Sequence, residues 1–165
     1  MTHILSVLVE DKPGVLAHIA SMFARRAFNI HSLAVGPSKE RGVSRMTLVV
    51  DAPALEQLTK QLNKLVNVLK VQELAGDETL EREVMLVRVA AGPGQRGEVV
   101  DTASIFAAKT LDVGPNSLTF ELTGDSHKVN AFLDLMRPYG ISDLVKSGRI
   151  ALQRDLKART LEAAG

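Results

Sequence analysis

The chain contains 165 residues, of which 45% are hydrophobic and 24% are charged, a mix that is typical of a folded globular protein. Its formal net charge of +1 provides no strong non-specific attraction to nucleic acid. Its lack of cysteine excludes disulfides, thiolate catalysis and cysteine-based metal sites. No stretch approaches the roughly 18–20 apolar residues of a membrane span, and the opening apolar run is too short for an export signal. We therefore expect a cytoplasmic protein without a membrane segment.

The first 75 residues are expected to fold in the order β-α-β-β-α-β. Runs of β-branched and aliphatic residues predict strands at 3–10, 29–35, 43–51 and 68–74. The first helix is indicated by apolar residues at i, i+3, i+4 and i+7, namely Leu16, Ile19, Ala20 and Phe23. The second helix is expected to begin at Pro53, with leucines at spacings of three and four as far as Leu69.

The second half repeats this plan after a short polar segment, AGDET, which is the predicted linker. Strands are expected at 83–91, from 111, at 118–122 and at 149–152, and helices around 99–107 and 129–136. The sequence therefore predicts an α+β protein made of two ferredoxin-like βαββαβ sandwiches. We divide it into a first domain at 1–75, a linker at 76–80 and a second domain at 81–165.

The predicted strands of the first half are apolar on both faces, although only one face can be covered by the two helices. Leu5, Val7 and Val9 point to one side of their strand, while Ile4 and Leu8 point to the other. We expect the second face, or an edge strand, to pack on a second subunit or on the second half, and we favour a homodimer over a fully internal cover.

No catalytic or metal site can be assembled from the sequence. The four histidines are scattered without metal-ligand spacing, and no serine lies in a nucleophile-elbow context. The GPGQRG segment at 92–97 lacks the Lys-Ser/Thr ending of a phosphate-binding loop, so we interpret it as a structural turn. An RNA-recognition module shares the βαββαβ order, but it needs aromatic platforms, and this chain has 5 Phe, 1 Tyr and no Trp. We predict neither catalytic residues nor metal ligands, and no nucleic-acid partner.

One segment, EDKPGVL at 10–16, combines a strand end, a turn and a helix start. The first turn of a helix leaves amide groups unpaired and carries the positive end of its dipole, so it can hold a carboxylate. Gly14 permits close backbone approach, and Asp11 can either cap the helix or bind an ammonium group. The same pattern is also that of an ordinary helix-start turn. The pattern alone leaves both interpretations open.

The segment from Ile4 to Pro37, with its DKPGVL turn and following Asn29-Ile30, resembles an ACT domain, the amino-acid-sensing form of this fold. The runs SRMTLVV from Ser44, QLNKLVNVLKV from Gln61, and the later IFAAKTLDV and LTG segments resemble the small regulatory subunits of acetohydroxyacid synthase (acetolactate synthase) from end to end. The resemblance implies a non-catalytic regulatory subunit that activates a separate catalytic subunit and confers feedback inhibition by valine, or by leucine or isoleucine, in branched-chain amino acid biosynthesis.

The resemblance also implies where the effector binds. Two ACT domains would associate as a homodimer, and the amides around Gly14, Val15 and Leu16, in the turn that contains Asp11 and Pro13, would hold the amino acid's carboxylate. Asn29 would hydrogen-bond its polar end, and Ile30 and Val35 would line its side chain. Many relatives have Asn where this chain has Asp11, and a carboxylate at this position can pair with the ligand's ammonium group.

The cofactors implied by the resemblance, thiamine diphosphate, magnesium and FAD, would bind the catalytic partner and not this chain. The second domain resembles the family's C-terminal domain, and the resemblance implies that it helps to engage that partner. The alternative is a free-standing ACT sensor that regulates another enzyme or a transcription complex.

Overall fold

The computed structural model describes residues 1–155, which form two compact units. The first unit is formed by residues 1–80 together with the described residues from Arg149 onward, and the second by residues 81–148. The last part of the predicted second domain, 156–165, lies outside the described residues.

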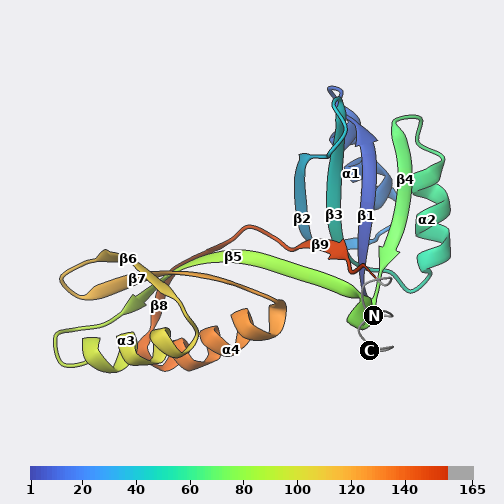
Figure 1. The fold of residues 1–165 in the computed structure, drawn as a ribbon. Coiled ribbons are helices and arrows are strands. Elements are labelled where there is room, and N and C mark those ends of the chain that lie inside the picture. Colours follow the sequence, from blue (N-terminus) through green and yellow to red (C-terminus); the bar gives the residue numbers. More distant parts are fainter. Residues whose placement is uncertain (156–165) are drawn as a thin grey trace, which may run out of the picture. The chain divides into compact units, whose positions relative to one another are not determined.

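The first unit is a four-stranded antiparallel sheet with the strand order β2-β3-β1-β4, and two helices pack on one face of it (Figure 1). Its elements are β1 Thr2–Glu10, α1 Val15–Arg25, β2 Asn29–Pro37, β3 Val43–Asp51, α2 Leu55–Asn63, β4 Val68–Leu74 and a short 3-10 helix, η1 Gly76–Glu78. This order is that of a ferredoxin-like βαββαβ sandwich, as predicted.

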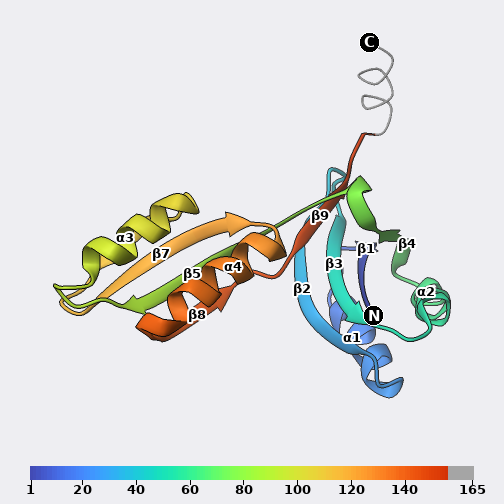
Figure 2. The same cartoon turned by 90° about the horizontal axis from the view of Figure 1, so that it is seen from below.

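The second unit repeats the topology, with the strand order β6-β7-β5-β8, and Figure 2 shows α3 and α4 side by side over one face of its sheet. Its elements are β5 Thr79–Ala90, α3 Arg96–Ile105, β6 Lys109–Val113, β7 Ser117–Gly124, α4 Ser126–Met136, η2 Arg137–Tyr139 and β8 Ile141–Lys146. The fold prediction of two such sandwiches is therefore confirmed.

The core of each unit lies between its sheet and its helices. In the first unit the side chains of Leu5, Val7, Leu48 and Val50 meet the inner faces of both helices. In the second unit Phe120 and Phe132 pack edge to face, with ring centroids 6.1 Å apart. Burial of these apolar side chains is the main term that holds each sandwich together.

Three predicted elements differ in the structure. The buried stripe of α1 is formed by Val15, Ile19, Met22 and Phe23, and Leu16 is 48% exposed. The helix α2 ends at Asn63, because the Lys64 amide turns back to bond the Gln61 carbonyl at 3.3 Å, so Leu69 lies in β4 and not on a helix. The predicted linker is short, since β5 begins at Thr79.

The fourth strand of the second sheet is β8, and not the segment 149–152 that the sequence pattern suggested. Most of β8 is exposed at the sheet edge, so its sequence lacks the alternation that marks a half-buried strand. The segment after it forms a separate strand, β9 Ile150–Gln153, which pairs with β5 outside the four-strand path.

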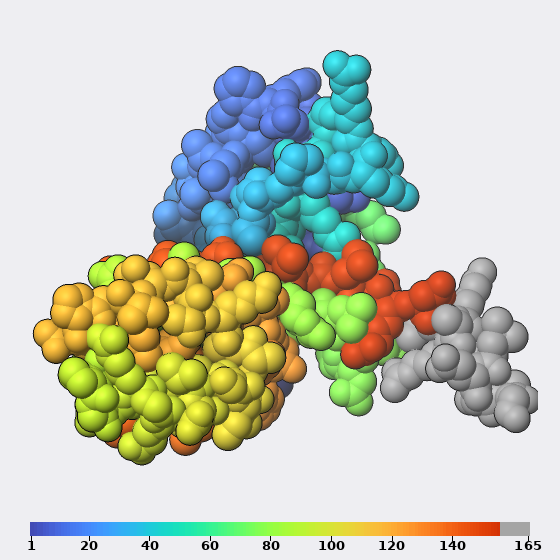
Figure 3. Space-filling model, turned by 60° about the vertical axis from the view of Figure 1, so that its left-hand side comes forward, coloured from blue at the N-terminus to red at the C-terminus, as the bar shows by residue number. Residues whose placement is uncertain are grey.

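The strand β9 covers the open face of the first sheet, which Figure 2 shows lying between β9 and α1. The Arg45 guanidinium donates to the Ala151 carbonyl at 2.9 Å, and the Gln72 amide donates to the Gln153 side chain at 2.7 Å. The Arg149 amide donates to the Ser32 hydroxyl at 3.2 Å. Figure 3 shows the red atoms of this segment along the first unit.

This cover comes from residues 149–153, which belong to the predicted second half of the chain. Beneath it Val49 is 1% exposed and Thr47 is 3% exposed, although both point away from the helices. The expectation that the second half of the chain covers this face is therefore confirmed for these residues, and the homodimer stays a prediction.

We expect Ala151→Asp to destabilise the first unit by about 2–4 kcal/mol, because Ala151 is 8% exposed and a carboxylate there would be buried without a partner. Urea denaturation measures the effect. Leu152→Asp is the matched control, since Leu152 is 56% exposed and should tolerate the charge. Equal costs for the two variants would show that β9 does not hold its place in solution.

The first helix of each unit ends in the same strained way. Ala27 and Ala107 have φ of 56° and 54°, the left-handed region that favours glycine. In α1 the Phe28 amide bonds the Phe23 carbonyl at 3.2 Å and the Ala27 amide bonds the Ala24 carbonyl at 3.3 Å, which together form a Schellman motif.

We expect Ala27→Gly to stabilise the chain by about 0.5–1 kcal/mol, because relief of the left-handed strain exceeds glycine's larger loss of chain entropy. The control is Ala24→Gly, at an exposed position inside the same helix, which should cost about 1 kcal/mol. Both are read from the midpoint of urea denaturation. A lower stability of the Ala27→Gly variant would contradict the view that the left-handed backbone at Ala27 is strained.

Candidate functional site

The turn between β1 and α1 is held in place by backbone hydrogen bonds. The Asp11 amide donates to the Gly42 carbonyl at 2.9 Å, and the Lys12 amide donates to the Glu10 carbonyl at 3.0 Å. Gly14 has φ of 86°, and no atom lies within 4 Å of the position that a Cβ would occupy there. The turn is therefore fixed in shape, and the space beside Gly14 is open.

Several amides at the entrance of α1 are free to bind a ligand. The first regular helical bond runs from the His18 amide to the Gly14 carbonyl at 3.0 Å, and the Val15 amide makes only a long contact of 3.4 Å to the Lys12 carbonyl. Within residues 1–155, no acceptor bonds the amides of Gly14, Leu16 or Ala17. These donors lie at the positive end of the helix dipole, which is the arrangement that holds a carboxylate.

The Asp11 side chain does not cap α1, which removes one of its two predicted roles. The neighbouring charges are paired with each other, since Lys12 Nζ lies 2.8 Å from Glu10 Oε2. Asp11 is exposed, and no ion pair involves it within the part of the chain that the structure describes. Its carboxylate therefore remains available to a cationic group.

The predicted site residues on β2 lie at different distances from this turn. Val35 pairs with Met46, which pairs with Val7, so Val35 lies toward the end of the sheet where the turn is. Asn29 pairs with Asp51, which pairs with Thr2 at the start of β1. Asn29 and the adjacent Ile30 therefore lie at the opposite end of the sheet.

This separation is too long for an amino acid to span within one chain. From Glu10 to Thr2 the strand covers roughly 27 Å at a rise of about 3.4 Å per residue. The structure thus groups Asp11, Pro13, Gly14, Val15 and Leu16 in one turn, and it does not bring Asn29 and Ile30 to them. A ligand that touches both sets needs two copies of the chain.

Beside Asn29, His31 and Asp51 form a polar cluster with the chain's amino group. His31 Nε2 lies 2.8 Å from Asp51 Oδ2, and the amino group of Met1 lies 3.5 Å from Asp51 Oδ1. The hydrogen bond from His31 is the main cause that lowers the pKa of Asp51 below its ordinary value. His31 occupies a bulge between Ile30 and Ser32, so its side chain is turned out of the regular ladder.

The matching turn of the second unit is built differently. The amides of Gln95 and Arg96 both bond the Gly92 carbonyl, at 3.0 and 3.1 Å. The Arg96 guanidinium donates to the carbonyls of Gly114 and Pro115 in the β6–β7 turn. The GPGQRG segment thus serves as a structural turn that ties α3 to a neighbouring loop.

Sequence reasoning missed the residues that anchor β9, above all Ser32, Arg45 and Arg149. The only local signal was the alternation in β9, where Ala151 is buried between the exposed Ile150 and Leu152.

Within residues 1–155 no three His, Asp or Glu side chains converge as metal ligands, and no helix there is long and apolar enough to cross a membrane.

Comparisons with known proteins cover both units. A family model described as the "AHAS small subunit-like ACT domain" matches residues 5–70, and one described as "Small subunit of acetolactate synthase" matches residues 82–155. The chain is 50% identical over 156 residues to the acetolactate synthase small subunit of Mycolicibacterium smegmatis, which covers 93% of this chain and 91% of that protein.

Similar relatives occur in archaea and among solved structures. A probable acetolactate synthase small subunit of Archaeoglobus fulgidus is 50% identical over 159 residues, with 95% and 99% of the two chains covered. The crystal structure of the acetolactate synthase small subunit from Thermotoga maritima matches with a TM-score of 0.86 at 35% identity, over 94% of this chain and 98% of that one.

Proposed function

The chain belongs to the family of acetolactate synthase small subunits, and on this premise we propose that it is a regulatory subunit that activates a separate catalytic subunit and makes it sensitive to valine or another branched-chain amino acid. The observation that carries the proposal is the set of free amides at the entrance of α1, beside the open space at Gly14. A helix entrance that lacks internal acceptors suits the carboxylate of an amino acid.

In this proposal the residues of the turn bind the polar end of the effector. The amides of Gly14, Val15 and Leu16 donate to its α-carboxylate, and Pro13 fixes the backbone that presents them. The exposed Asp11 carboxylate accepts from the ammonium group, so the zwitterion meets a charge of opposite sign at each end.

A second copy supplies the rest of the site. If the two β2 edges lie side by side and antiparallel, the Asn29 and Ile30 end of one chain meets the turn of the other. Asn29 then hydrogen-bonds the effector, and Ile30 and Val35 line its aliphatic side chain. The resulting homodimer has two equivalent sites, related by the twofold axis.

Feedback requires that the effector bind one state of the assembly more tightly than another. A coupling free energy of about 1–3 kcal/mol would change the affinity for the effector roughly 5- to 150-fold between the two states. We assign thiamine diphosphate, magnesium and FAD to the catalytic partner and no cofactor to this chain, and we place the assembly in the cytoplasm.

Adding the chain to its cognate catalytic subunit should raise the rate of acetolactate formation several-fold and make that rate fall on addition of valine. A colorimetric assay of acetolactate, with and without valine, leucine and isoleucine, measures both effects and ranks the effectors. Unchanged rates together with separate elution of the two proteins would favour the alternative, a free-standing sensor of another system.

Gly14→Asp should weaken valine binding at least tenfold, because the new carboxylate would lie where the ligand's carboxylate binds. Gly76→Asp is the matched control: it adds the same charge at a glycine that also has positive φ and open space, far along the chain from the turn. Isothermal calorimetry of the purified chains measures both. Equal binding by the two variants would place the site elsewhere.

The dimer arrangement gives a sharper test. Asn29→His should also lose binding, yet an equal mixture of Gly14→Asp and Asn29→His chains, unfolded and refolded together, should regain it. In a mixed dimer one site receives an intact turn from one chain and an intact Asn29 from the other, while the second site carries both changes. If the refolded mixture bound no valine, the site would not be shared between two copies of the chain.

A further inference from the structure

A hollow of about 520 Å³ lies between α1 and α2, apart from the proposed effector turn. Its volume is within the range of small-molecule sites. Its lining residues all belong to the two helices and their ends, and none belongs to the effector set; they are His18, Ser21, Met22, Arg25, Arg26, Gln61, Lys64 and Leu65.

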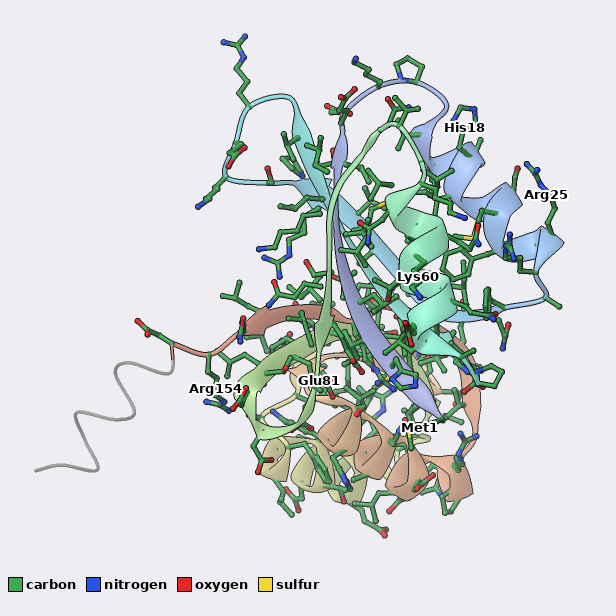
Figure 4. All side chains as sticks on the ribbon, turned by 90° about the vertical axis from the view of Figure 1, so that its right-hand side faces the viewer. Met1, His18, Arg25, Lys60, Glu81 and Arg154 are labelled. Carbon is green, nitrogen blue, oxygen red and sulfur yellow. The ribbon has the colours of Figure 1, made fainter. Side chains whose placement is uncertain are left out.

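The charged residues of the lining, Arg25, Arg26 and Lys64, are all basic. His18, Ser21, Met22 and Arg25 recur at i, i+3, i+4 and i+7, so one stripe of α1 forms this wall, and Lys64 stands on the opposite wall. No acidic residue lines the hollow. Figure 4 shows His18 and Arg25 projecting from α1 beside the neighbouring helix α2, which carries Lys60.

The surrounding charges leave these cations unpaired. The helix α1 contains no Asp or Glu, and the one acidic residue of α2, Glu56, is paired with Lys60 at 2.7 Å. Within residues 1–155, no carboxylate lies within 4.0 Å of a side-chain nitrogen of Arg25, Arg26 or Lys64. Cations that face one another across a hollow raise the local concentration of anions.

A smaller, more apolar hollow of about 220 Å³ adjoins the basic one and shares His18, Lys64 and Leu65 with it. It extends along Val15 and Ile19 to the segment 66–68 that follows α2. A ligand in the basic hollow therefore has apolar surface next to it, on which a hydrocarbon or ring part can pack.

We propose that the basic hollow between α1 and α2 is a second ligand site, which binds a small polyanion that bears phosphate or carboxylate groups and whose apolar part extends into the adjoining hollow. The planar guanidinium groups of Arg25 and Arg26 can each donate two hydrogen bonds to such an oxyanion, in a bidentate arrangement. Lys64 adds a positive charge from the other side. Ser21 and Gln61 supply neutral hydrogen-bonding groups.

Calorimetry on the full chain at low ionic strength, where surface charge is least screened, tests the site with pyrophosphate and citrate as separate probes. We expect one anion per chain, and we expect Arg25→Gln and Lys64→Gln each to weaken binding about tenfold or more. Arg41→Gln, which removes the same charge from the exposed β2–β3 loop, is the control and should change little. The midpoint of urea denaturation of the same variants reports whether the fold is intact.

Several results would overturn the proposal. Equal losses in Arg25→Gln, Lys64→Gln and Arg41→Gln would mean that the anions respond only to net charge. If neither pyrophosphate nor citrate bound and an acidic peptide did, the hollow would be a contact site for another protein and not a small-molecule site. Phenyl phosphate should bind more tightly than inorganic phosphate, and equal affinities would exclude the apolar extension. The preference between pyrophosphate and citrate separates the two oxyanion classes.

Discussion

The antiparallel pairing of β1 with β3 is the constraint on which the first unit depends. It sets Leu5 opposite Leu48 and Val7 opposite Met46, so one face of the sheet becomes the core beneath α1 and α2. The same register places the amide-rich turn at one end of the sheet and Asn29 at the other. A shift by one residue would turn each of these side chains to the opposite face, so core and candidate site are fixed together.

The two units share one topology but differ at the turn before their first helix. In the first unit the entrance of α1 leaves donors without acceptors and an open space at Gly14. In the second unit the Gly92 carbonyl accepts from the amides of Gln95 and Arg96, which correspond to those of Gly14 and Val15, and the Arg96 side chain donates to the β6–β7 turn. The difference lies in a few loop residues, whereas the strand order and the helix-packed core are common to both. In our proposal the effector therefore binds at the turn of the first unit, and the sandwich supplies its rigid support.

The return of the chain as β9 changes which surfaces of the first unit are open to a partner. The face that the helices leave uncovered is occupied by the β9 segment, which Arg45 holds at Ala151 and Ser32 holds at Arg149. Within residues 1–155 no strand pairs with the outer edge of β2, where Val35 is half exposed. An exposed edge strand with apolar side chains is a template for pairing with another chain. Our proposed dimer therefore uses the edge of the sheet and not its face.

The sequence by itself determined the two βαββαβ units, because apolar residues at intervals of two and of three to four record which side of each strand or helix is buried. It also marked the EDKPGVL turn, since its glycine and proline act on the local backbone. Tertiary structure alone decided the role of β9, the exposed strand β8 and the distance between Gly14 and Asn29. These depend on which segments pair across long separations, and neither the four residues of β9 nor the exposed pattern of β8 carries that information.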